Sequence, residues 1–295
     1  MATREPGPIR AARMLRSDLR RAREVAGLTQ IEVAERMEWS LSKVARIENG
    51  DVGIVANDLR ALARLFGMGE AATREMLRRN DASRARGWWY EYRTVMSSVY
   101  ADIVGMESDA DKLCDFATSV IPGLLQTPGY AEAVISTGRE LYARESTEQF
   151  DVGLRVELRL ERQRRILDGS DPPELMVVLD ESTLYRSFGG VETMSEQVRR
   201  LAELARRPHI RVRILPFERL SLCPHGYLLV DRELVYAELV SGDVLFDDPV
   251  RVGLYADLFG VIWRSALDAD RTGQLLRRVA GDYESGRQPR PWLWE

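Results

Sequence analysis

The sequence predicts an α+β protein in which an N-terminal five-helix domain is joined to a larger C-terminal domain of helices plus a small mixed sheet. Up to residue 80, apolar residues recur with the period of an α-helix, whereas after Pro173 short β-branched runs appear. A chain of 295 residues also exceeds the usual length of one domain, so two domains are expected. We place them at residues 10–80 and 88–285, with a linker at 81–87 and a tail at 286–295.

Charge is divided unevenly along the chain. Residues 1–86 contain 17 Arg and Lys against 12 Asp and Glu, a net charge of +5. Because the whole chain carries −4, residues 87–295 carry −9. A basic module joined to an acidic one is expected if only the first contacts phosphates.

The composition argues against several classes of protein. No run approaches the roughly eighteen apolar residues of a membrane-spanning helix, and the N-terminal MATREPGPIRAAR lacks the apolar stretch of a signal peptide. We therefore expect a cytoplasmic, nucleoid-associated protein without membrane contacts. Cys114 and Cys223 have no CxxC spacing, which argues against a disulfide framework or a zinc site and favours two buried thiols.

The first helix is followed by a capped second helix. Apolar residues recur at helical spacing at Leu15, Leu19, Ala22 and Ala26. Gly27 ends this helix. Thr29 and Glu32 then form a T-x-x-E capping box, so a new helix is predicted to begin at Gln30.

A third helix is predicted between Ser40, a good N-cap, and Asn49-Gly50, which stops it. Val44 and Ile47 face inward. Two helices of about eight residues, joined by a turn near Glu38-Trp39, make a helix-turn-helix unit whose second helix enters the major groove of DNA. An ordinary helical hairpin is the alternative, but the hydroxyl, ammonium and guanidinium groups on the outer face argue against it.

The pattern TQxxVAxRMxWSxSKVxRIENG resembles the phage-repressor/Cro-like helix-turn-helix family, also called the xenobiotic-response-element class. The resemblance covers about Leu15 to Phe66 and implies DNA binding. Glu38 stands where the family usually has Gly at a positive φ angle, so the turn is either strained or of another shape. Leu41 stands where many relatives have a Gln that pairs with adenine, so an apolar contact, as with a thymine methyl, must substitute. The family's operator sequences therefore do not transfer.

The DNA-binding residues that we predict are Gln30, Ser40, Leu41, Ser42, Lys43, Arg46 and Asn49. Ser42, Lys43 and Arg46 are expected to face the groove, and Arg46 is best suited to read a guanine. The residues assigned to backbone phosphates are Gln30, Ser40 and Asn49.

Two further helices complete the N-terminal domain. Asn57 is expected to cap the first of them, and the second runs from about Glu70 to Arg79. The polar, basic segment 80–87 marks the domain boundary, with a continuing helix as the alternative. The WWYEY segment after it is interpreted as docked core and not as a ligand site.

The first part of the C-terminal domain is predicted to be helical. A helix at 113–120 is followed by a Pro-bounded turn at 122–128 and a new helix from about Gly129. Residues 152–160 alternate as in a strand, but the surrounding Glu, Arg and Gln favour a helix that continues to Leu167.

A mixed sheet is predicted after Pro173. Strands at 175–179 and 210–217 flank a helix at 193–206, an order that suggests a parallel pair. GYLLV, LVYAELV and DVLF form an antiparallel meander. Helices at about 249–267 and 269–284 finish the domain, and the RQPRPWLWE tail is expected to be loosely held.

Several C-terminal segments, in order, are similar to the domain that accompanies this helix-turn-helix type in actinobacterial WhiJ-like regulators. They include WWYEY, IPGLLQTPGYAEAVI, LDESTLYRSFGG and QVRRLAELARRPHIRVRILPF. The resemblance spans about residues 87–285. It implies regulation of development or secondary metabolism and a small protein partner, and no site residue transfers with it.

Little in the sequence points to catalysis. Cys223 and His225 could ligate a metal, but no second Cys/His cluster completes the set. Asp180 and Glu181 follow a strand end, where catalytic carboxylates occur, but a helix N-terminus favours acids there too. No glycine-rich phosphate cradle is found. We expect no enzymatic activity, no metal and no cofactor.

Three functional hypotheses follow. The first is a sequence-specific transcriptional regulator that binds double-stranded DNA. It is expected to be a homodimer, because one short helix makes too few base contacts. Its second domain would sense a small-molecule effector or a protein. The second is an antitoxin-like or anti-regulator interaction module that pairs with a small protein, its DNA binding being autoregulatory. The third, an enzyme on a DNA-binding domain, would depend on Asp180, Glu181 or His225.

Overall fold

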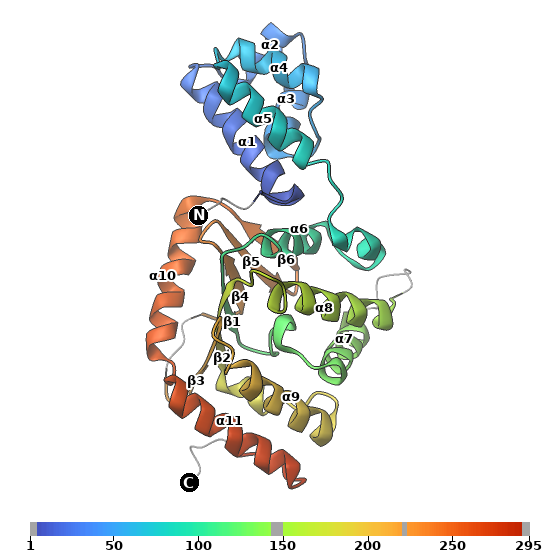
Figure 1. Ribbon diagram of the computed structural model, residues 1–295, viewed down its shortest axis with the longest axis vertical. Helices are drawn as coiled ribbons and strands as arrows, with labels where there is room; N and C mark the ends of the chain where they lie inside the picture. The colour runs from blue at the N-terminus through green and yellow to red at the C-terminus, as the bar shows by residue number, and fades with distance from the viewer. Residues whose placement is uncertain (1–4, 143–149, 220–222, 291–295) are drawn as a thin grey trace. The chain divides into compact units, whose positions relative to one another are not determined.

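A computed structural model describes residues 5–142, 150–219 and 223–290 of the chain (Figure 1). The chain divides into two units, residues 1–90 and residues 91–295. The first is helical, and the second combines helices with a six-stranded sheet, which confirms the predicted α+β class. Among the described helices, none is both long and apolar enough to cross a membrane.

From residue 5 on, where its description begins, the N-terminal unit has five helices: α1 (Pro8–Val25), α2 (Gln30–Met37), α3 (Leu41–Asn49), α4 (Ala56–Leu65) and α5 (Glu70–Ala82). Its core draws on all five, through Leu15, Leu19, Val33, Val44, Ile47, Leu59, Leu62 and Met76. The capping box confirms the predicted start of α2, because Thr29 Oγ1 accepts from Glu32 N and the Glu32 carboxylate accepts from Thr29 N at 2.8 Å.

Two details of this unit differ from expectation. Asn57 is not the N-cap of α4: Val55 occupies that position, and Asn57 lies in the first turn, where its Oδ1 accepts from Arg60 at 3.1 Å. Helix α5 continues past Arg79 to Ala82, because Met76 and Asn80 share its buried face.

The C-terminal unit begins with helical segments and ends with two long helices. The 3₁₀ helix η1 (Trp88–Val95) spans the division between the units. Trp89 and Tyr92 in it are buried, whereas Tyr90 is 38% exposed, so the docked-core interpretation holds for only part of the segment. The other helices are α6 (Ser98–Glu107), η2 (Gly123–Leu125), α7 (Pro128–Tyr142), α8 (Val152–Leu167), η3 (Glu181–Leu184), α9 (Gly190–Leu204), α10 (Pro249–Ser265) and α11 (Ala269–Glu284). Helix α8 confirms the helical interpretation of its alternating sequence. The last five residues of the predicted tail lie outside the described residues.

The strands are β1 (Lys112–Ala117), β2 (Glu174–Asp180), β3 (Ile210–Leu215), β4 (Tyr227–Val230), β5 (Leu234–Leu239) and β6 (Gly242–Phe246). Their order in the sheet is β3-β2-β1-β4-β5-β6. The first three are parallel, and β4, β5 and β6 continue antiparallel from β1. The predicted parallel pair and the predicted meander are both confirmed.

The prediction of a helix at 113–120 was wrong, because this segment contains the central strand β1. Its apolar residues at 113, 116, 117 and 120 satisfy helical spacing, but a strand that is buried on both faces is apolar at many positions too. Pairing with β2 on one side and β4 on the other decides the outcome.

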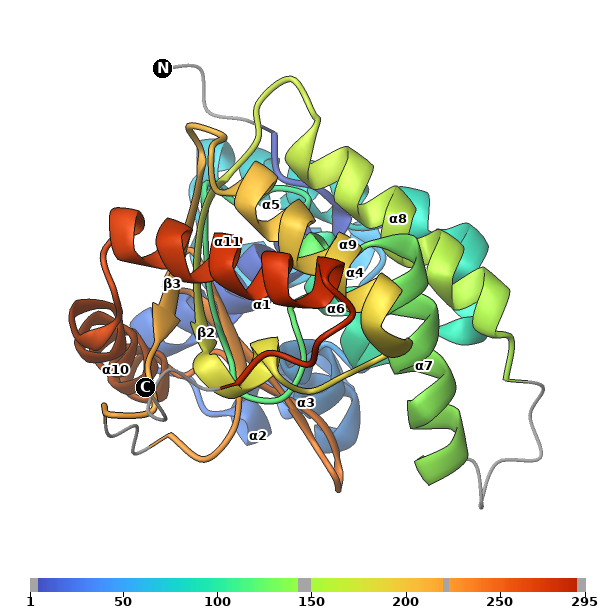
Figure 2. The same ribbon diagram turned by 90° about the horizontal axis from the view of Figure 1, so that it is seen from below.

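Helices cover both faces of the sheet (Figure 2). Helix α10 packs Val252, Phe259 and Ile262 against one face, together with Phe116 from β1. Helices α7, α8 and α9 lie on the other face, and α11 packs against α9 and β3. Cys114 and Cys223 are buried free thiols in the core beneath α10, as predicted.

Candidate nucleic-acid interface

The turn between α2 and α3 keeps a left-handed residue without glycine. Glu38 has φ 54° and ψ 40°, and the next residue, Trp39, donates its N–H to Ala34 O at 2.8 Å. A non-glycine residue at positive φ is sterically costly. The sequence left open a strained turn or a turn of another shape, and the structure has the strained turn.

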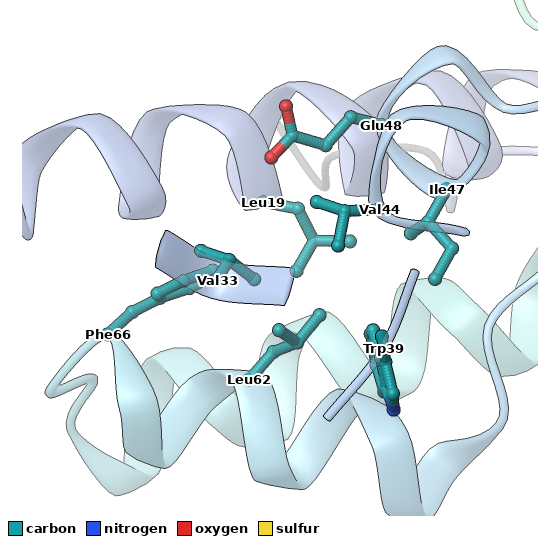
Figure 3. A pocket seen from close by; sticks show the side chains of 8 residues that line it. All are labelled: Leu19, Val33, Trp39, Val44, Ile47, Glu48, Leu62 and Phe66. Carbon is teal, nitrogen blue, oxygen red and sulfur yellow. The ribbon is translucent and has the colours of Figure 1, made fainter. Parts of the chain in front are cut away.

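Helix α3 is closed at both ends by the residues that the sequence suggested. Ser40 Oγ accepts from Lys43 N at 3.1 Å, and Gly50 ends the helix with φ 85°. Figure 3 shows the side chains that line a small pocket between α3 and its neighbours: Leu19, Val33, Trp39, Val44, Ile47, Glu48, Leu62 and Phe66. The inward positions of Val44 and Ile47 leave the opposite side of α3 facing outward.

A buried carboxylate ties α3 to α1 and α2. Glu48 is 5% exposed, and its two oxygens accept from Arg23 Nε at 2.7 Å and Arg23 Nη2 at 3.1 Å. Gln30 Nε2 adds a third bond at 2.9 Å. The hydrogen bond with Glu48 is the main reason that the pKa of Arg23 is raised. Sequence reasoning missed this network, although Glu48 stands four positions after inward-facing Val44.

Two arginines of α1 bind the carboxyl end of α3. Arg16 Nη1 donates to Asn49 O at 3.1 Å, and Arg20 Nη2 donates to Glu48 O at 3.3 Å. Cationic groups at this end satisfy free carbonyls and oppose the helix dipole. Together with Glu48, they fix where α3 lies within the domain.

The outer face of α3 presents most of the predicted DNA-binding residues to solvent. Leu41, Ser42, Arg46 and Asn49 are exposed. The Arg46 guanidinium makes no hydrogen bond or ion pair with any described residue. It is therefore available to a ligand on this face.

The other predicted residues already have partners within the domain. Lys43 Nζ lies 2.9 Å from Asp58 Oδ2 and 3.6 Å above the Trp39 ring centroid. The Gln30 amide nitrogen binds Glu48, and Ser40 Oγ caps α3. Contact of Lys43 with a base would require it to leave Asp58.

The carboxylates considered for catalysis serve as local hydrogen-bond acceptors. Asp180 Oδ1 accepts from Ser182 N at 2.9 Å. Glu181 is buried and accepts from Phe217 N and Tyr185 Oη at 3.1 and 2.9 Å. Within the described ranges, no cluster of three or more His, Cys, Asp or Glu is arranged to hold a metal ion.

Comparison with known families finds two matches along the chain. Residues 15–76 match the family described as helix-turn-helix domain, and residues 100–278, more than half of the chain, match the family described as domain of unknown function (DUF5753). The chain belongs to the DUF5753 family. No curated protein and no solved structure matches it. In this DUF5753 protein, the family domain follows a helix-turn-helix domain of the kind found in DNA-binding regulators.

Proposed function

We propose that this DUF5753 protein is a sequence-specific transcriptional regulator that reads the major groove of double-stranded DNA with α3. The observation that carries the proposal is the exposed Arg46 guanidinium beside Ser42, which has no partner in the described part of the chain and lies on a helix held by Glu48. A guanidinium can donate two hydrogen bonds to guanine, which gives base discrimination. The +5 charge of residues 1–86 supports attraction to phosphates.

Physical argument and sequence resemblance support a dimeric state and a regulatory role. The regulator acts as a homodimer on two half-sites, because one short helix contacts too few bases. The Cro-like motif and the WhiJ-like segments support a role in development or secondary metabolism of an actinobacterium, in the cytoplasm. The C-terminal unit then senses an effector and catalyses no reaction.

The test is selection of a binding site from random duplexes, followed by equilibrium binding at several salt concentrations. We expect one enriched palindromic motif and an affinity that falls steeply with salt, as phosphate contacts require. Enrichment of no sequence, or an affinity independent of salt, contradicts the proposal.

An interaction module is the second candidate, and one surface favours it. Val250, Leu254 and Val261 recur on one side of α10 and are 74%, 66% and 52% exposed. Exposed apolar rows of this kind occur where proteins bind partners. This function predicts that the unaltered protein co-purifies with a small protein encoded beside its gene and releases DNA when the two bind. The Leu254→Asp variant should lose the small protein.

A further inference from the structure

A cavity of about 290 Å³ lies in the C-terminal unit, beside the end of β1 and the start of β4. Its walls include residues 115–123 from β1 and the segment after it, and residues 224–228 leading into β4. Strands β2 and β3 follow one another on one side of β1 in the sheet, whereas β4 pairs with the other side of β1. In open sheets with parallel strands, ligands bind where the strand order reverses in this way.

Asp115 is the unusual group in this cavity. It lies in the middle of the central strand, on the face opposite Cys114 and Phe116, which belong to the core beneath α10. Its carboxylate receives no hydrogen bond and no ion pair from any described residue. Burial raises its pKa from 3.8 to about 7. Asp115 is half-buried, and a carboxyl that lines a cavity without a partner is a candidate for ligand binding.

The neighbouring Arg162 guanidinium is engaged elsewhere, whereas that of Arg159 is engaged in part, because its buried Nε has no hydrogen-bond partner among the described residues. Arg162 Nε donates to Glu107 at 2.6 Å, its Nη2 pairs with the same carboxylate, and its Nη1 donates to Tyr100 Oη at 3.2 Å. Arg159 Nη1 donates to Gln126 Oε1 at 2.7 Å. Arg162 therefore does not neutralise Asp115 by direct contact.

The charges around the cavity favour a cation. Glu238 also lines it and accepts from Tyr236 Oη at 2.9 Å. Buried Glu107, which does not line the cavity, neutralises Arg162, and this leaves the carboxylates of Asp115 and Glu238 against the Arg159 guanidinium. The rings of Tyr100 and Tyr236 add aromatic surface, which attracts cations. A metal ion would require several oxygen ligands, and the described residues hold no such cluster.

We propose that this cavity binds a small organic amine whose ammonium group pairs with the Asp115 carboxylate. The apolar body of the amine packs on Val120, Ile121 and Leu228, which also line the cavity. This inference goes beyond DNA binding and does not depend on it, because its test contains no DNA.

The experiment measures binding to the full-length chain by isothermal titration calorimetry at pH 8. The probes are 2-phenylethylamine, 2-phenylethanol and 3-phenylpropionate, which share an aromatic body and differ in the charged group. We expect saturable one-to-one binding of the amine, at least tenfold weaker binding of the alcohol, and no binding of the acid. Absence of saturable amine binding, or equal affinity for amine and alcohol, overturns the proposal.

Two variants assign the effect to one carboxylate. Asp115→Asn should weaken amine binding at least tenfold and leave binding of the alcohol unchanged, a difference that general damage to the cavity would not produce. Asp111→Asn removes an exposed carboxylate just before β1 and should change neither. Full amine affinity in Asp115→Asn overturns the proposal.

A pH series on the unaltered protein supplies a test that needs no variant. The ionisable groups that face Asp115 are Arg159 and Arg162 from α8, Glu107 and Tyr100 from α6, Glu238 and Tyr236 from β5, and His225 before β4. Because a carboxyl with pKa about 7 is mostly neutral at pH 6 and mostly ionised at pH 8, amine affinity should rise about tenfold over this range. The same rise is expected in His225→Asn. A flat profile for the amine contradicts the pairing with Asp115.

Discussion

Arg23 of α1 and Glu48 of α3 form a two-bond ion pair between residues 25 positions apart, with nitrogen–oxygen distances of 2.7 and 3.1 Å. Glu48 is 5% exposed, so water cannot replace the arginine. The pair holds the carboxyl end of the proposed reading helix against the first helix. Base recognition depends on placing a few side chains accurately, so this contact connects the fold of the domain to its proposed function.

Loss of Glu48 should destabilise the N-terminal unit. Glu48→Ala removes the buried carboxylate that Arg23 pairs with and leaves this arginine only the Leu28 carbonyl at 2.9 Å and the more distant Glu24. Breaking a buried pair in this way costs about 3–5 kcal/mol. Urea unfolding followed by circular dichroism measures the loss. Glu24→Ala removes a carboxylate that is 61% exposed and 3.8 Å from the same arginine, and it should change little. Equal destabilisation by the two variants would show that Arg23–Glu48 does not fix α3.

Replacing Glu38, in the turn between α2 and α3, by glycine should increase the stability of the N-terminal unit. Glu38→Gly relieves a side chain held at φ 54° and should stabilise the domain by about 1 kcal/mol. Glu35→Gly, in the right-handed part of α2, should destabilise it by about 1 kcal/mol. The thermal midpoints of the two variants report both effects. A loss of stability in Glu38→Gly would mean that the carboxylate has a role in the turn that outweighs the backbone strain.

Stability should depend on pH through Asp115. Its pKa is raised from 3.8 to about 7 in the folded chain, so the folded state holds a proton that the unfolded state releases between these values. The resulting stabilisation is complete below pH 3.8 and is lost as pH rises through about 7. The difference in thermal midpoint, Asp115→Asn minus unaltered protein, should therefore increase from pH 5 to pH 8. A constant difference across this range would show that Asp115 ionises as it does in water.

The ion pair between Lys43 and Asp58 should restrain DNA binding. Asp58→Asn releases Lys43 and removes a negative charge near the interface, so affinity for all duplexes should rise several-fold, and more at low salt. Asp81→Asn, on α5, removes the same charge from another surface and serves as the control. Binding is measured by fluorescence anisotropy. Weaker binding by Asp58→Asn would instead mean that Asp58 positions Lys43 for contact.

Features that depend on neighbours in the sequence were predicted well. The Thr29–Glu32 capping box and the Ser40 cap form within four residues, so their side-chain chemistry is visible in the sequence. Strand β1 was missed because its apolar spacing fits a helix, and only its pairing with β2 and β4 distinguishes the two.

The candidate sites show the same limit. The outward face of α3 follows from periodicity, but the partners that hold Glu48 and Lys43 lie up to 25 and 15 positions away. Asp115 gives no local signal at all. Asp115 has no direct partner because Arg162 binds Glu107, and Arg162 and Glu107 lie 55 positions apart in the sequence.

The central claim is that α3 reads DNA through Arg46, and equilibrium binding of Arg46→Ala to the selected duplex tests it most directly. Loss of a two-bond contact with guanine should weaken binding about 5- to 150-fold and abolish discrimination at one base pair. Arg74→Ala, which removes an exposed arginine from α5, should change affinity less than twofold. Unchanged affinity and unchanged base discrimination in Arg46→Ala would contradict the account.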